Sequence, residues 1–150
     1  SMCMLVSPLK LLEKGYADWG SELTPEYSPY DAGLGFCVAL DKDDFIGKKA
    51  LAKIKAEGPK WKLCSFTIDT GKPLMLQGSA PILQEGKVLG VTCSSGYGHT
   101  VKKNICYAYI PAEQADPDIE FEIESYNTVY TATLESRRIL YDPDRKKINQ

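Results

Sequence analysis

A carboxylate flanked by glycines and aromatic side chains is the first feature of this sequence that could do chemistry. Glu13 lies in the segment 12–25, and the aromatic residues Tyr16 and Trp19 follow within six positions. An ionised carboxylate can accept two hydrogen bonds from neighbouring N–H groups of a planar heterocycle, and aromatic residues can form walls for a flat ring. The alternative is an ordinary surface glutamate on a short helix, which is a common feature of soluble proteins.

A second segment, 96–104, contains the single histidine, His99, between glycines and lysines. Gly96 and Gly98 lack the third glycine of a dinucleotide-binding loop, so we expect them to permit a tight bend at the rim of a sheet. His99 has no cysteine or acid at a helical offset, so no metal ligand is assigned. We expect a loop histidine that caps backbone groups rather than a general base. No catalytic residue is assigned, and both segments are typical of ligand-positioning parts of a larger enzyme.

Composition excludes several classes of protein. The 150 residues carry a net charge of −2, with a pI near 5.5, which gives no general attraction to nucleic acid or anionic membranes. No apolar run approaches the roughly 20 residues that span a bilayer. Five widely spaced cysteines favour reduced thiols, and therefore a cytoplasmic or organelle-matrix location. Ser1-Met2 is typical of a tag-cleavage scar, so we expect a piece of a longer protein, with the chemistry upstream.

The first 59 residues read as mixed helix, loop and strand. A hydroxyl cap and a proline at Ser7-Pro8 predict a helix that ends at Gly15. Residues 20–33 are loop-like, and the apolar run 34–40 predicts a strand buried on both faces. Apolar residues at helical spacing over 46–54 then predict a helix that ends at Gly58-Pro59.

The pattern after Pro59 changes to the alternation of β-strands. Strands are expected near 62–68, 81–84, 88–93, 105–110, 119–124 and 128–134, with a short one at 139–141. About six antiparallel strands in this length predict a small barrel or sandwich. The expected core includes Phe66, Ile68, Val91, Phe121 and Ile123. The alternating glutamates of 120–124 are expected on the solvent face of an edge strand.

A series of ordered motifs runs through the sequence: Glu13-Lys14-Gly15-Tyr16, Trp19-Gly20-Ser21-Glu22-Leu23, Thr24-Pro25, Ala32-Gly33-Leu34, the run from Lys42 to Leu51, Pro81-Ile82-Leu83, Gly90-Val91-Thr92, Ser95 to His99, Lys103-Asn104-Ile105 and Ala108 to Pro111. Through these motifs the sequence resembles the glycine-cleavage T-protein (aminomethyltransferase) family over residues 5–141, and especially the T-protein-like halves of dimethylglycine and sarcosine dehydrogenases.

The resemblance implies an α+β chain: the end of a folate-binding α/β module over 1–59, a C-terminal antiparallel Greek-key β-barrel over 60–141, and a polar tail over 142–150. It also implies that Glu13 binds the pterin ring of tetrahydrofolate, with Tyr16 and Trp19 beside it. The family's proton-handling aspartate lies upstream of the part that this chain matches, so the isolated chain is expected to be inactive.

Two function classes follow. In the first, the parent protein is a folate-linked one-carbon enzyme, either an aminomethyltransferase or a flavin-dependent N-methyl amine dehydrogenase with FAD in an N-terminal domain. Its partners would be a reduced folate, a small N-methyl amine or aminomethyl donor, and the N-terminal domains of the same chain, in the cytoplasm or the mitochondrial matrix. In the second, the parent is a non-catalytic regulatory or scaffold module. Leu11 stands where the family usually has arginine, and this departure keeps the second class open.

Overall fold

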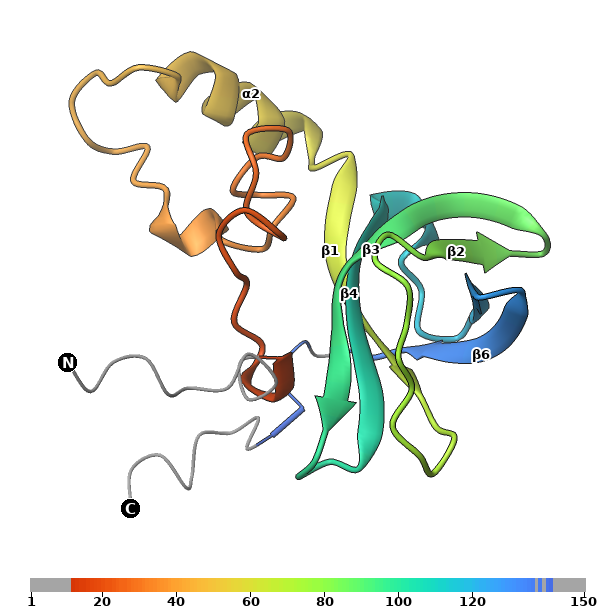
Figure 1. Cartoon of the computed structure of the whole chain (residues 1–150). Helices are drawn as coiled ribbons and strands as arrows, with labels where there is room; N and C mark the ends of the chain where they lie inside the picture. The colour runs from red at the N-terminus through yellow and green to blue at the C-terminus, as the bar shows by residue number, and fades with distance from the viewer. Residues whose placement is uncertain (1–11, 137, 139, 142–150) are drawn as a thin grey trace, which may run out of the picture.

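The computed structural model describes residues 12–136, 138, 140 and 141. It consists of an irregular N-terminal segment, residues 12–60, and a β-barrel to which that segment is attached (Figure 1). The elements are η1 (Gly35–Cys37), α2 (Lys48–Glu57), β1 (Trp61–Ile68), β2 (Pro81–Gln84), β3 (Lys87–Gly98), β4 (Lys103–Pro111), η2 (Ala112–Gln114), β5 (Glu120–Ser125) and β6 (Thr128–Leu134). No helix in this part of the chain is long and apolar enough to cross a membrane.

Within the described residues, six antiparallel strands form a closed barrel in the order β1-β4-β3-β2-β5-β6. Phe66 on β1 pairs with Leu134 on β6, and this pairing closes the barrel. Strands β2, β3 and β4 are sequential neighbours while β1 lies beside β4, which is a Greek-key order. The predicted fold class is therefore confirmed. The prediction of an edge strand at 120–124 is wrong, because closure pairs β5 with both β2 and β6.

Two tight turns explain why the sequence forms these hairpins. Glu85 and Gly86 connect β2 to β3, with φ of 50° and 78°, and Tyr126 and Asn127 connect β5 to β6, with φ of 49° and 59°. A two-residue hairpin turn with positive φ at both positions matches the natural twist of antiparallel strands.

The barrel interior confirms four of the five predicted core residues. Phe66, Ile68, Phe121 and Ile123 are buried, and the rings of Phe66 and Phe121 pack edge to face with centroids 5.3 Å apart. The prediction for Val91 is wrong, since this side chain is 48% exposed. The register of β3 shifts against both of its neighbours, and such bulges change which residues face inward.

The N-terminal segment contains one confirmed and one incorrect prediction. Helix α2 ends at Gly58, as expected, although none of its residues is buried. The strand expected at 34–40 is absent from the described structure, where the 3-10 turn η1 occupies 35–37. A closed barrel offers no free edge with which a further strand could pair. The helix start predicted at Ser7-Pro8 lies outside the described residues.

A second apolar cluster fastens the N-terminal segment to the outer face of β1 and β4. Tyr27 stacks on Tyr109 with ring centroids 3.6 Å apart and an interplanar angle of 8°. The Asp31 carboxylate accepts a hydrogen bond from the Trp61 N–H, and the Asp31 carbonyl accepts one from the Leu63 N–H. These contacts place residues 12–36 beside the barrel and so position the candidate site.

Candidate functional site

Glu13 lies in the helical residues 12–14, which two sets of hydrogen bonds hold in place. The Tyr107 hydroxyl donates a hydrogen bond of 2.6 Å to the Leu12 carbonyl. The backbone N–H groups of Leu140 and Tyr141 donate to the Glu13 carbonyl at 3.0 and 2.9 Å. Gly15, with φ of 76°, ends the turn in the left-handed conformation that the sequence predicted.

The Glu13 carboxylate is bound to the loop that follows β3. Its Oε1 atom accepts hydrogen bonds from the N–H groups of Thr100 at 2.7 Å and Val101 at 3.2 Å. Glu13 is only 5% exposed, so the interpretation as an ordinary surface glutamate is wrong. The two segments singled out in the sequence are therefore brought together in space.

The second oxygen of this carboxylate, Oε2, accepts no hydrogen bond within the part of the chain that the structure describes. A carboxylate has capacity for about four hydrogen bonds over its two oxygens. Glu13 thus retains acceptor capacity on a side chain whose orientation is fixed by its other oxygen.

Tyr16 and Trp19 differ in their relation to this carboxylate. Tyr16 is 55% exposed and lines a pocket that begins at the residues directly after Glu13, whereas Trp19 is 82% exposed and does not line that pocket. Trp19 instead pairs with Leu23 in an isolated bridge across a tight turn. The structure brings Tyr16 to the pocket and leaves Trp19 outside it.

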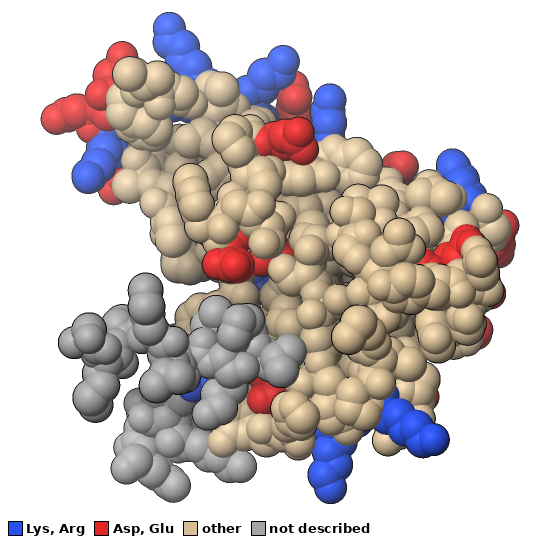
Figure 2. Space-filling model, in the orientation of Figure 1, with Lys and Arg blue, Asp and Glu red and all other residues tan. Residues whose placement is uncertain are grey.

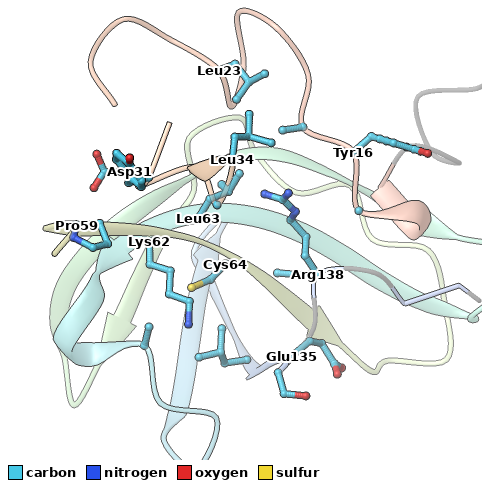
Figure 3. A pocket seen from close by; sticks show the side chains of 18 of the residues that line it. Tyr16, Leu23, Asp31, Leu34, Pro59, Lys62, Leu63, Cys64, Glu135 and Arg138 are labelled. Carbon is cyan, nitrogen blue, oxygen red and sulfur yellow. The ribbon is translucent and has the colours of Figure 1, made fainter. Parts of the chain in front are cut away.

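The pocket has a volume of about 820 Å³ and lies between the N-terminal segment and the outer face of β1 (Figure 3). Most of its lining residues lie within 14–17, 62–65 and 134–136, or are Tyr30, Asp31, Gly33, Leu34, Phe36 and Arg138. Arg138 lies near the middle of the view in Figure 3. The Nη1 group of Arg138 donates a hydrogen bond of 2.9 Å to the Ala32 carbonyl. Pockets of a few hundred to about 1,000 Å³ hold small organic ligands.

Glu22 is a buried residue whose role the sequence reasoning missed. Its Oε2 atom accepts a hydrogen bond of 2.8 Å from the Asp18 N–H, and its carbonyl accepts one of 2.9 Å from the Tyr109 hydroxyl. Its Oε1 atom is buried without a partner. Glu22 belongs to the motif Trp19 to Leu23 quoted above, so the signal was present, but periodicity alone assigns no role to it.

The cysteines of the site region are protonated thiols at neutral pH. Burial raises the pKa of Cys64 and of Cys93 to about 11, and that of Cys106 to about 12. Because the thiolate is the nucleophile, none of these three groups is activated for covalent catalysis. His99 is exposed, and its ring contacts Tyr97 edge to face. Within the described residues, no group of three or more His, Cys, Asp and Glu side chains could hold a metal ion.

On the face shown in Figure 2, lysine and arginine side chains extend mainly from the periphery, around α2 and the lower rim of the barrel, and uncharged residues occupy most of the centre.

Comparison with known proteins decides the family. Residues 62–142 match the family model described as "Glycine cleavage T-protein C-terminal barrel domain". The chain belongs to this family. Dimethylglycine dehydrogenase, mitochondrial, of Mus musculus is 36% identical over 141 residues, which are 93% of this chain and 16% of that protein. An aminomethyltransferase of Symbiobacterium thermophilum is 38% identical over 107 residues, covering 70% of this chain and 28% of that protein.

A solved structure supports the same fold. The glycine cleavage system aminomethyltransferase T from Bartonella henselae superposes with a TM-score of 0.76 at 24% identity, covering 85% of this chain and 36% of that one. The T-protein-like chain thus spans about a sixth to a third of the length of these relatives.

Proposed function

We propose that this chain is the C-terminal part of a folate-linked one-carbon enzyme and helps to position a reduced folate. The observation that carries the proposal is the Glu13 carboxylate, which is buried and fixed through Oε1, and whose Oε2 accepts no hydrogen bond from a described residue. The names of the relatives, an aminomethyltransferase and a dimethylglycine dehydrogenase, support one-carbon chemistry on an amine in the parent protein.

The contribution of Glu13 would be recognition of a flat heterocycle. The 2-amino group and the adjacent ring N–H of a pterin are donors, and a carboxylate oxygen shielded from water is a strong acceptor for them. The Thr100 and Val101 N–H groups hold the carboxylate in one orientation before the ligand arrives, which reduces the entropy lost on binding. Tyr16, at the mouth of the adjacent pocket, is the aromatic residue that could lie along the ligand.

The bound folate would act as the acceptor of the one-carbon unit. The residues of this chain that the proposal uses bind and orient, and none of them is assigned a proton-transfer step. In the parent protein the donor would be a small N-methyl amine or an aminomethyl group, and FAD would be required in a separate domain if the amine is oxidised. The names of the mitochondrial relatives favour the mitochondrial matrix, with the cytoplasm as the alternative location.

The test is a titration of tetrahydrofolate into the chain under anaerobic, reducing conditions. Binding is monitored through the amide signals of Thr100 and Val101 in NMR spectra. Wild type should bind with Kd on the order of 1 mM or tighter. Glu13→Gln retains an acceptor for the two loop N–H groups but places an amide donor opposite the donors of the pterin. We expect binding about ten- to a hundred-fold weaker, because a charge-assisted pair is worth about 1.5–3 kcal/mol.

Two controls separate recognition from structure. Glu124→Gln makes the same substitution on an exposed residue of β5 and should leave binding unchanged. Glu13→Gln should also unfold at nearly the wild-type temperature, since the Oε1 contacts survive. Equal affinity of Glu13→Gln and wild type, or no binding by wild type, would favour the scaffold function, in which Glu13 only fastens the 99–102 loop to the N-terminal segment.

A further inference from the structure

The hydroxyl of Ser65 is a buried polar group that neither the fold nor the proposed folate site explains. Ser65 is 1% exposed on β1, and its Oγ atom has no hydrogen-bond partner among the residues that the structure describes. Its residue lines the 820 Å³ pocket described above. A buried hydroxyl without a partner is costly, so its position at a pocket wall points to a ligand that supplies the partner.

Arg138 places a guanidinium in the wall of the pocket that Ser65 also lines. The segment that carries it is held along β1, because the Glu135 N–H donates to the Ser65 carbonyl at 2.9 Å. The guanidinium makes one hydrogen bond, to the Ala32 carbonyl. One bond therefore orients the group, and its other donors have no partner among the described residues. A guanidinium presents a planar fork that matches the geometry of a carboxylate.

The charges of the pocket favour a negatively charged ligand. Three cationic residues line it, Lys14, Lys62 and Arg138, against two acidic ones, Asp31 and Glu135. Both carboxylates are already engaged. Asp31 accepts hydrogen bonds from the N–H groups of residues 28 and 61, and Glu135 accepts one from the hydroxyl of residue 67.

Much of the remaining lining is apolar. Leu34, Leu63 and Pro59, which are labelled in Figure 3, contribute to it together with Leu134. Such walls suit the hydrocarbon or aromatic body of a ligand and give no partner to a highly charged group such as a phosphate.

We propose that this pocket binds the carboxylate of a small organic acid, with the Arg138 guanidinium and the Ser65 hydroxyl as donors and the leucine side chains against the acid's apolar body. Glu13 does not line this pocket, so the proposed carboxylate site can be tested separately from the proposed function. The carboxylate has two possible sources: a free acid, or the glutamyl end of a folate, since Tyr16 and Lys14 connect the pocket to the neighbourhood of Glu13.

The test titrates three probes into the chain and monitors binding through the NMR amide signals of Leu63, Ser65 and Ser136. Benzoate represents a free acid, p-aminobenzoyl-L-glutamate represents the tail of a folate, and benzyl alcohol is the uncharged match of benzoate. We expect benzoate to bind with Kd on the order of 1 mM and benzyl alcohol to leave the signals in place. If p-aminobenzoyl-L-glutamate binds more tightly and is displaced by tetrahydrofolate, the natural carboxylate is that of a folate; if not, it is that of a free acid.

Two substitutions test the donors. Arg138→Gln should weaken benzoate binding at least tenfold, because charge-assisted hydrogen bonds are lost. Ser65→Ala should weaken it about three- to tenfold without lowering the melting temperature, because the hydroxyl has no protein partner to lose. This combination distinguishes a ligand-binding role from a structural one, and it holds even if Arg138→Gln fails to fold. Lys87→Gln and Ser95→Ala, at exposed positions of β3, should change neither quantity.

Three results would overturn the proposal. Absence of shifts at ~10 mM benzoate, about tenfold above the expected Kd, would show that the pocket takes no such acid. Equal binding of benzyl alcohol would show a merely apolar crevice. Unchanged affinity in Ser65→Ala, with Arg138→Gln either unchanged or unfolded, would show that the two donors are not part of a site.

Discussion

Gly98 lies so close to Glu13 that a Cβ atom on Gly98 would stand 3.0 Å from Glu13 Oε1. The same Cβ would lie 2.7 Å from Val101 Cγ2 and 2.8 Å from Ile105 Cδ1. The glycine therefore allows the end of β3 to approach the carboxylate, and the Thr100 and Val101 N–H groups that fix Oε1 follow directly after it. The geometry of the candidate folate carboxylate depends on the absence of this one side chain.

Gly98→Ala should lower the free energy of unfolding by about 1–3 kcal/mol, the usual cost of forcing an extra methyl group into a packed site. Urea denaturation measures this change. Gly78→Ala is the matched control, because a Cβ at Gly78 would meet nothing within 4 Å and its φ is not positive. That substitution should be neutral or raise stability by a few tenths of a kcal/mol. Equal effects of the two substitutions would show that the approach of Gly98 to Glu13 is not tight.

The barrel could be predicted from the sequence because its signals are local. Alternation of apolar residues identifies β1 and β5, and the residue pairs 85–86 and 126–127 identify the hairpin turns. The sequence does not predict that Val91 faces outward, because the register shift between β2 and β3 changes which β3 side chains face the interior, and a bulge is not visible in the alternation. The run 34–40 has the composition of a buried strand, but apolar composition alone does not reveal whether a sheet edge is available to pair with it.

The site could be predicted only in part. Family resemblance identified Glu13, but nothing in the sequence indicated that Thr100 and Val101, almost ninety positions away, would donate to it. Ser65 and Arg138 are ordinary residues in the sequence. They are candidates because, among the described residues, the Ser65 hydroxyl has no hydrogen-bond partner and the Arg138 guanidinium makes one hydrogen bond. Both are properties of the tertiary structure.

The buried thiols predict a loss of stability at alkaline pH. The pKa values of Cys64 and Cys93 rise from 9.0 to about 11 on folding, chiefly through burial. Between these two values the folded chain retains protons that the unfolded chain has released, so stability falls as the pH rises through this interval. Below pH ~9 these thiols are protonated in both states and contribute no pH dependence.

Urea denaturation at intervals from about pH 8 to 11 measures this effect. Cys93→Ser, whose hydroxyl does not titrate in this range, should show a shallower decline than wild type. A free energy of unfolding that stays constant or rises between about pH 9 and 11 would contradict the assignment of these thiols as buried and protonated.

Glu22 offers a direct probe of the electrostatics behind the pocket wall. Burial is the larger cause of the raised Cys93 pKa, and the negative charge of Glu22 is the next. Glu22→Gln removes this charge and keeps an acceptor for the Asp18 N–H, so the pKa of Cys93 should fall and its thiolate fraction at a given pH should rise. The free energy of unfolding should change by no more than about 1 kcal/mol, the worth of one hydrogen bond.

Alkylation with iodoacetamide near pH 9, measured at each cysteine by peptide mass mapping, should be faster at Cys93 in the variant. Cys64, whose pKa is shifted by burial, Lys62 and Arg138, is the internal control and should react at the wild-type rate. Acceleration at both cysteines would indicate general loosening of the N-terminal segment, and acceleration at neither would contradict a contribution of Glu22 to the raised pKa of Cys93.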